Sequence, residues 1–259
     1  MCGTLRGGVL IQWVRSALFV VQMYAMMAVL AVFFTPLAVL DRAWAFRGIH
    51  TYARWVRWTA RWMVGLRTDV RGPVPTEEVI VAAKHQSFLD ILILVSVLPR
   101  PKFIMKASLK WAPILGWYAL RIGCVPVDRG KRARAVEQMV QGVRDGRAGP
   151  GQLIIYPQGT RVAPGAHLPY KIGVGILYEQ LGQPLVPAAT NVGVFWPRTG
   201  IYRTPGLAVV EFLPEIPPGR PAPDMLRDLE RAVEARSNAL MREAGFNGAL
   251  PDPRPTGAP

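Results

Sequence analysis

An uncharged apolar run, Ser16–Leu40, is the strongest constraint on how this chain can fold. Its 25 residues exceed the roughly 20 apolar residues that a helix needs to span the hydrocarbon core of a bilayer. The run is too long for the apolar core of a signal peptide, and no convincing small-residue cleavage site follows it. We therefore expect a retained membrane helix, which Pro36 should kink or end.

Composition narrows the possible partners of the chain. The 259 residues carry a formal charge of +14, and a field of that sign attracts nucleic acid, anionic lipid headgroups or phosphorylated cofactors. Apolar residues make up 51% of the chain and the mean hydropathy is +0.20, which is high for a nucleic-acid-binding protein. A membrane surface accounts for both values, so we expect a lipid bilayer and no nucleic acid as partner.

The segment Asp41–Leu66, unlike the uncharged run before it, is rich in arginine and tryptophan. On a helical projection the arginines lie beside the tryptophans. The residues concerned are Arg47, Arg54, Arg57 and Arg61, and Trp44, Trp55, Trp58 and Trp62. This pattern predicts a helix in the headgroup layer. The alternative is that the tryptophans pack on the rest of the protein.

The topology of the two helices stays open at this stage. A single crossing would place the basic segment and the following domain inside, by the positive-inside rule. Alternatively, both helices dip into one leaflet as a hairpin, because Arg6 and Arg15 make the other flank positive as well.

After Arg71 the chain alternates between short apolar runs and helical patterns, which predicts an α/β domain with a mixed, largely parallel sheet flanked by helices. The expected strands are Glu78–Ala83, Lys102–Lys106, Cys124–Val127, Gln152–Tyr156, Leu185–Ala189 and Leu207–Phe212. The expected helices are Ile91–Leu98, Ile114–Arg121, Lys131–Arg147, Ile172–Leu181 and Asp224–Gly245. We therefore divide the chain into membrane-anchoring helices (1–67), an α/β domain (68–245) and a disordered tail (246–259).

A histidine and an aspartate lie where the first buried strand gives way to a helix. Ser87 is a candidate N-cap, and Asp90 is the third helical residue after it. Side chains in a helix lean towards its N-terminus, so Asp90 should point back to His85 and fix its tautomer. His85 could then act as a general base on a substrate hydroxyl. By itself, the spacing favours the simpler interpretation, a capping aspartate beside a loop histidine.

Four blocks resemble the glycerolipid acyltransferase family, typified by bacterial 1-acylglycerol-3-phosphate acyltransferases. His85–Asp90 is similar to the family's His-x-x-x-x-Asp motif, and Gly123–Arg129 to its second block. Tyr156–Arg161 resembles the third block, and Val186–Ala188 the proline-centred fourth. The four blocks occur in family order, after a hydrophobic helix pair that is also typical of the family.

The resemblance implies a reaction and a set of roles. His85 would deprotonate the hydroxyl of 1-acylglycerol 3-phosphate, which attacks an acyl thioester on coenzyme A or acyl carrier protein, and Asp90 would orient His85. Arg129 and Arg161 fall where the family binds the acceptor's phosphate, and a guanidinium suits phosphate oxygens. Other candidates are Lys106 for the phosphate, and Gln158, Gly159 and Thr160 for positioning the acceptor. Amides near Ser87 or in the Gly159 loop could stabilise the oxyanion.

The resemblance also implies a product, a cofactor requirement and a cellular location. It implies phosphatidic acid as product in phospholipid biosynthesis, no resident cofactor, and a bacterial inner membrane with the site facing the cytoplasm. We expect no metal ion, because His50 and His167 lack metal-ligand spacing. With two distant cysteines, the chain suits a reducing compartment.

Gln158 departs from the family pattern, which has glutamate at this place in the third block. Glutamine keeps hydrogen-bonding ability but loses the negative charge. The acceptor could therefore be another lyso-lipid, such as a lyso-aminolipid, or the chain could be a non-catalytic lipid-binding protein. A lipid hydrolase would need a Gly-x-Ser-x-Gly elbow, which the sequence lacks. No partner is evident for Ser87, Ser96 and Ser108 as nucleophiles.

Overall fold

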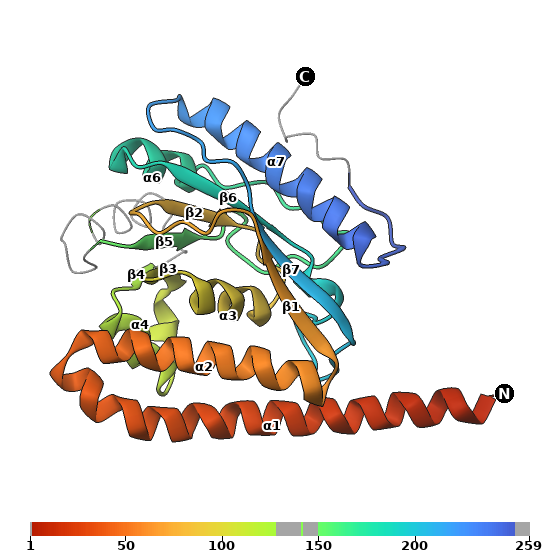
Figure 1. Ribbon diagram of the computed structural model, residues 1–259. Coiled ribbons are helices and arrows are strands. Elements are labelled where there is room, and N and C mark those ends of the chain that lie inside the picture. The colour runs from red at the N-terminus through yellow and green to blue at the C-terminus, as the bar shows by residue number, and fades with distance from the viewer. Residues whose placement is uncertain (1, 128–140, 142–149, 252–259) are drawn as a thin grey trace.

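A seven-stranded sheet forms the centre of the computed structural model, which describes residues 2–127, 141 and 150–251 (Figure 1). Its strands are β1 (Leu66–Arg71), β2 (Ile80–Ala83), β3 (Pro101–Lys106), β4 (Val125–Val127), β5 (Gln152–Ile155), β6 (Leu185–Thr190) and β7 (Gly206–Phe212). They lie in the order β1-β7-β6-β2-β5-β3-β4, and neighbouring strands are parallel except β6 and β7. The predicted mixed, largely parallel sheet is confirmed.

Helices cover both faces of this sheet (Figure 1). They are α1 (Cys2–Leu40), α2 (Arg42–Met63), α3 (Phe88–Val97), α4 (Leu115–Arg121), α6 (Gly173–Leu181) and α7 (Ala222–Glu243), with short 3-10 helices η1 (Ala107–Trp111) and η2 (Val192–Val194). One face packs on α3 and α2, and the other on α6 and α7. Because β2 is buried along its whole length between these layers, the residues that follow it are held firmly.

Helix α1 lies outermost and antiparallel to α2 (Figure 1). Its stretch Gly8–Leu40 is long and apolar enough to cross a membrane. Of the two expected effects of Pro36, a kink or an end, the end does not occur, because the helix runs on to Leu40. Asp41 then caps α2 by accepting from the Ala43 amide. More than half of the exposed large hydrophobic side chains of the described residues belong to α1.

Polar contacts fasten α1 to the rest of the protein at both ends. Near its start, the Gln12 side chain donates to the carbonyls of Val64 and Arg203, at 3.0 and 2.8 Å. Towards its other end, Arg121 of α4 donates to the Ala38 carbonyl at 2.8 Å. Helix α1 therefore lies along the domain rather than projecting away from it.

Helix α2 divides its aromatic stripe between two environments. Trp58 and Trp62 are 56% and 55% exposed, as the headgroup interpretation expects. Trp55 is half-buried and donates to the Gln22 side chain of α1 at 2.9 Å, as the packing interpretation expects. Arg57 does not belong to the predicted exposed row of arginines, because its guanidinium is directed into the protein and donates to the Ser96 hydroxyl at 2.6 Å.

Several local predictions need correction. The edge strand β1 was missed because alternate residues are polar, as in Arg67, Asp69 and Arg71, and because it directly follows a helical pattern. The predicted boundary at residues 67 and 68 therefore falls inside a strand. Residues 246–251 of the predicted tail lie against the domain, where the Asn238 amide donates to the Pro251 carbonyl at 2.8 Å. The rest of the predicted tail and nearly all of the predicted helix 131–147 lie outside the described residues.

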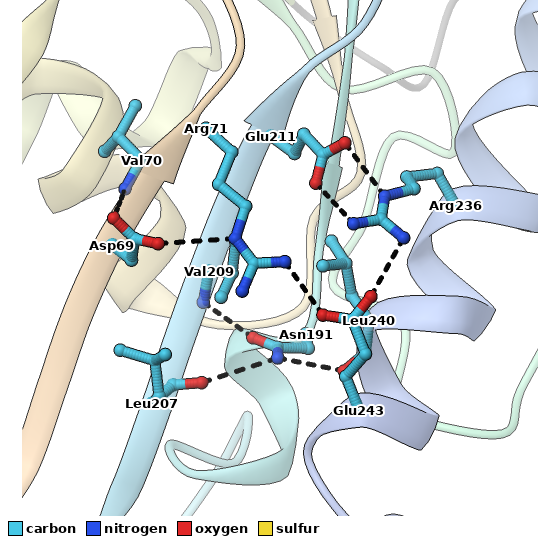
Figure 2. Close-up of polar contacts among 10 residues, drawn as sticks. All are labelled: Asp69, Val70, Arg71, Asn191, Leu207, Val209, Glu211, Arg236, Leu240 and Glu243. Carbon is cyan, nitrogen blue, oxygen red and sulfur yellow. Dashed lines mark hydrogen bonds and ion pairs between the residues drawn. The ribbon is translucent and has the colours of Figure 1, made fainter.

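Helix α7 is joined to the sheet by the buried amide of Asn191, drawn in Figure 2. Its Nδ2 donates to the Leu240 carbonyl at 3.1 Å, and its Oδ1 accepts from the Val209 amide at 2.7 Å. At the surface, Arg236 bridges Glu211 of β7 and Glu243 of α7. The buried amide should contribute more than the half-exposed ion pairs, because solvent screens the latter.

Replacing Asn191 by alanine should therefore destabilise the fold. The substitution leaves the Val209 amide without a partner inside the protein, which costs about 1–3 kcal/mol, while the Leu240 carbonyl keeps only the Ala244 amide. We expect a clear fall in the thermal unfolding midpoint in detergent. Arg236→Ala is the matched control and should lower it much less; an equal fall would contradict this ranking of the two contacts.

Candidate active site

The end of β2 and the start of α3 form a rigid turn that carries His85 and Asp90. Ser87 is the N-cap of α3, and its hydroxyl accepts from the Leu89 amide at 3.0 Å. Asp90 closes the reciprocal half of the capping box by accepting from the Ser87 amide at 2.8 Å. The cap expected from the sequence is present, and it fixes the aspartate carboxylate next to the histidine ring.

The Asp90 carboxylate, 1% exposed, gathers donors on both oxygens. Oδ2 accepts from the Gln86 and Ser87 amides at 2.8 Å each. Oδ1 lies 2.8 Å from Nδ1 of His85. A buried carboxylate favours the tautomer with the proton on Nδ1. Nε2 of His85 is then the basic nitrogen, and it has no hydrogen-bond partner among the residues described.

Tyr156 completes this group, and the sequence did not single it out. Its ring stacks on His85 with centroids 3.9 Å apart, and its hydroxyl donates to Asp90 Oδ1 at 3.1 Å. Burial, together with the Asp90 carboxylate, raises the pKa of Tyr156 well above its usual range. The tyrosine thus remains a donor at neutral pH. The aromatic position of the third block was the available signal, but its partner Asp90 lies 66 residues away.

His85 lines a cavity of about 360 Å³ that has one cationic and one apolar part. Lys106, Gly159, Thr160, Arg161 and Arg198 contribute the polar lining. The apolar lining comes from α2, α3, β3 and α4. Four of the sequence-predicted residues, Lys106 and Gly159–Arg161, are thus brought together with His85. Such a cavity can hold a molecule with an anionic head and a long apolar tail beside a basic nitrogen.

Arg161 and Arg198 hold each other at the cationic part. Arg161 donates to the Arg198 carbonyl at 2.9 Å, and Arg198 donates to the Arg161 carbonyl at 3.3 Å. Neither guanidinium has a carboxylate partner in the described part of the chain, so both can meet an anion. Arg198 lies beyond the four blocks, and sequence reasoning missed it. Arg129, predicted to share this task, lies outside the described residues.

The third-block loop owes its shape to Gly159. This residue has φ of 69°, in the left-handed region that side chains disfavour. The Val162 amide then donates to the His85 carbonyl at 2.8 Å, which joins the loop to the end of β2. The loops that carry His85 and Arg161 therefore form one unit.

Gln158, which the sequence predicts to position the acceptor, is not among the residues that line the cavity. It is 2% exposed, and its amide donates to the Leu168 carbonyl at 3.2 Å and to Glu234 Oε1 of α7 at 3.4 Å. The same Glu234 carboxylate pairs with Lys84 at 2.5 Å and accepts from Tyr170 at 3.1 Å. Glu234 thereby joins the two loops from the face of the sheet opposite His85.

No side chain near His85 is placed as a covalent nucleophile in the described residues. Burial raises the pKa of the Cys124 thiol, in the cavity wall, to about 12, so the thiolate is scarce. Ser87 and Ser96 are engaged as a helix cap and as the partner of Arg57. His85 can therefore act directly on a substrate, as a base.

The candidate oxyanion donors expected from the sequence are mostly engaged. The amides of Gln86, Ser87, Gly159 and Val162 already donate within the protein. Those of Thr160 and Arg161 have no acceptor among the residues described. The Phe88 amide at the helix start has none either, so both expected locations keep a free donor.

Comparisons with known proteins identify similar chains. The family model described as Acyltransferase matches residues 67–191. The chain is 25% identical to a 1-acyl-sn-glycerol-3-phosphate acyltransferase of Pseudomonas aeruginosa, covering 90% of this chain and 92% of that protein. It is 31% identical to an uncharacterised acyltransferase of Schizosaccharomyces pombe, covering 71% of each.

A solved structure shares the fold. The crystal structure of the 1-acyl-sn-glycerophosphate acyltransferase of Thermotoga maritima superposes with a TM-score of 0.74 at 20% identity. The match covers 88% of this chain and 97% of that one.

The position of Gln158 leads to a charge-swap prediction. Gln158→Glu buries a second carboxylate beside Glu234, where both cannot ionise without repulsion, so the fold should lose about 1–3 kcal/mol. Glu234→Gln alone should also destabilise, because it leaves buried Lys84 without its carboxylate.

The double variant Gln158→Glu/Glu234→Gln should recover most of the loss, since one carboxylate again lies among the same partners. Thermal unfolding of all four proteins measures the coupling. Additive losses in the double variant would contradict the shared cluster.

Proposed function

This chain belongs to the acyltransferase family, and on that premise we propose that it acylates 1-acylglycerol 3-phosphate to give phosphatidic acid. The acyl donor is a thioester on coenzyme A or on acyl carrier protein. The observation that carries the proposal is the cavity in which a carboxylate-oriented histidine lies between cationic side chains and an apolar wall. The relatives named for this activity support the same acceptor.

His85 begins the reaction as general base. Its Nε2 takes the proton of the acceptor hydroxyl while the alkoxide oxygen forms a bond to the thioester carbonyl carbon. The Asp90 carboxylate, held by two backbone amides and Tyr156, stabilises the imidazolium that results.

The tetrahedral intermediate then collapses. Its carbon–sulfur bond breaks, the sulfur takes the proton back from His85, and the carrier leaves as a free thiol. The negative oxygen of the intermediate needs amide donors close by, and the amides of Phe88, Thr160 and Arg161 are candidates because no group of the described chain accepts from them.

The acceptor's phosphate belongs at the cationic part of the cavity. Arg161 is the first candidate, because it follows directly on the loop joined to His85. Arg198, which contacts Arg161, and Lys106 line the same cavity and can share the phosphate charge. The acyl chains then extend along the apolar lining towards α4 and α2.

Of the two membrane arrangements, we propose the hairpin within one leaflet. Helix α1 is fastened to the domain near its start by Gln12 and near its end by Arg121. A perpendicular crossing would carry one of these contacts, and the domain with it, into the bilayer. An α1–α2 hairpin lying in the leaflet keeps both contacts and the exposed apolar face of α1 in lipid.

The direction of Gln158 weakens the case for a different lyso-lipid. That alternative relied on the changed residue touching the acceptor, but Gln158 faces α7 behind the sheet. A non-catalytic lipid-binding protein would have no need for a histidine whose tautomer is fixed by a buried carboxylate.

The central test is substitution of His85. His85→Ala should abolish acyl transfer from both thioester donors while leaving the thermal unfolding midpoint nearly unchanged. Asp90→Asn should lower kcat by about a hundredfold to ten-thousandfold, because it removes the charge that supports the imidazolium. Tyr156→Phe keeps the ring stack and loses one hydrogen bond, so it should cost only about tenfold. Full activity of folded His85→Ala would disprove the mechanism.

Arg161 should govern the acceptor rather than the chemistry. Arg161→Ala removes a charged hydrogen-bond donor and should raise KM for 1-acylglycerol 3-phosphate by about tenfold to a hundredfold, with a smaller effect on kcat. Arg220→Ala, which removes a half-exposed arginine paired with Asp228, is the matched control and should leave both constants unchanged. An unchanged KM in Arg161→Ala would remove this residue from the phosphate site.

A further inference from the structure

A second cavity, of about 430 Å³, lies at the free edge of the sheet between α2 and β1. It is lined by Arg57, Trp58, Arg61, Arg67, Thr68, Asp69 and Leu207. None of these residues lines the cavity of His85. A ligand bound in this cavity would therefore be a molecule other than the acyl donor and the acceptor.

The lining of this edge cavity carries an excess of positive charge. Its one carboxylate, Asp69, accepts from the Val70 amide at 2.9 Å and from Arg71 at 3.3 Å, as drawn in Figure 2. Arg61 and Arg67 are exposed and have no ion-pair partner among the residues described. An anion would therefore be attracted to the cavity and would meet little competition inside it.

Arg57 is already in place for such an anion. Its Nε donates to the Thr68 hydroxyl at 2.8 Å, and its Nη1 donates to the Ser96 hydroxyl at 2.6 Å. Both partners are neutral, and the nearby Asp69 carboxylate offsets only part of the guanidinium charge. Burial lowers the pKa of Arg57, although an arginine remains protonated at neutral pH. A partly desolvated cation with fixed orientation gains more from an anion than a free surface arginine does.

The tryptophans at the edge cavity indicate its depth in the bilayer. Trp58 is exposed, and its ring contacts those of Trp55 and Trp62, with centroids 5.2 and 5.7 Å away. Arg15 of α1 donates to the Trp62 carbonyl at 3.0 Å, so this aromatic row adjoins the apolar helix. Tryptophans beside arginines mark the headgroup level of a bilayer.

We infer that the edge cavity binds the phosphate of an anionic phospholipid in the leaflet, apart from the acyl-transfer site. The lipid's phosphate would meet Arg57, Arg61 and Arg67, and its chains would pass Trp58 into the layer that holds α1. The bound lipid fixes the depth and tilt of the α1–α2 hairpin. The inference shares with the proposed function only the premise of a membrane surface.

Quenching of tryptophan fluorescence by lipids with brominated acyl chains tests the inference, using the full chain in neutral detergent micelles. Brominated phosphatidylglycerol should quench at a lower mole fraction than brominated phosphatidylcholine. Arg61→Gln/Arg67→Gln should raise the half-quenching fraction for phosphatidylglycerol by about tenfold or more, as expected for lost charged hydrogen bonds. Both residues are exposed and outside the reaction cavity, so folding and acyl transfer in neutral micelles should persist.

Arg47→Gln/Arg54→Gln is the matched control, because it removes two exposed arginines of α2 that lie outside the edge cavity. It should shift the half-quenching fraction by much less. Equal shifts in the two double variants would mean unspecific attraction and would overturn the site. Equally, competition by inorganic phosphate at the concentration of the lipid would show a free-anion site and overturn the lipid assignment. Specific quenching without acyl transfer would uphold this inference and disprove only the proposed function.

Discussion

The buried carboxylate of Asp90 is the interaction on which the candidate active site depends. Burial of a charge is expensive unless hydrogen bonds replace water, and here the first turn of α3, the β2 loop, His85 and Tyr156 all supply donors. The same contacts cap a helix, set a tautomer and fix a ring. A local folding motif therefore does the positioning that catalysis requires, with no separate scaffold for His85.

The two loops that meet at this carboxylate are held from both faces of the sheet. On the cavity side, the Val162 amide donates to the His85 carbonyl. On the other side, Glu234 joins Lys84 and Gln158, so the C-terminal helix, which lies beyond the matched family region, takes part in holding the site. The neutral side chain at position 158 is explained by this carboxylate, because a second one beside it would be repelled.

Sequence reasoning succeeded where the deciding contacts are local. The Ser87 cap and the approach of Asp90 to His85 follow from helix geometry over six residues, and the strands with continuous apolar runs were found. It failed where the order of the strands in the sheet decides which residues meet. Arg198 reaches the cavity from a distant loop, and Gln158, after β5, contacts α7 instead of the cavity. The polar edge strand β1 was missed because only one of its faces needs apolar residues.

The placement of charge separates two kinds of arginine in this protein. Residues 1–68 contain eight arginine or lysine residues in all but only one acidic residue, Asp41. In contrast, α7 contributes acidic partners such as Glu243 and Asp228, which pair with Arg236 and Arg220. Paired surface arginines of the second kind contribute little to stability and can be exchanged. Of the first kind, Arg61 and Arg67 have no ion-pair partner among the described residues, and an anionic surface beside the apolar hairpin would offset the repulsion between such neighbouring cations.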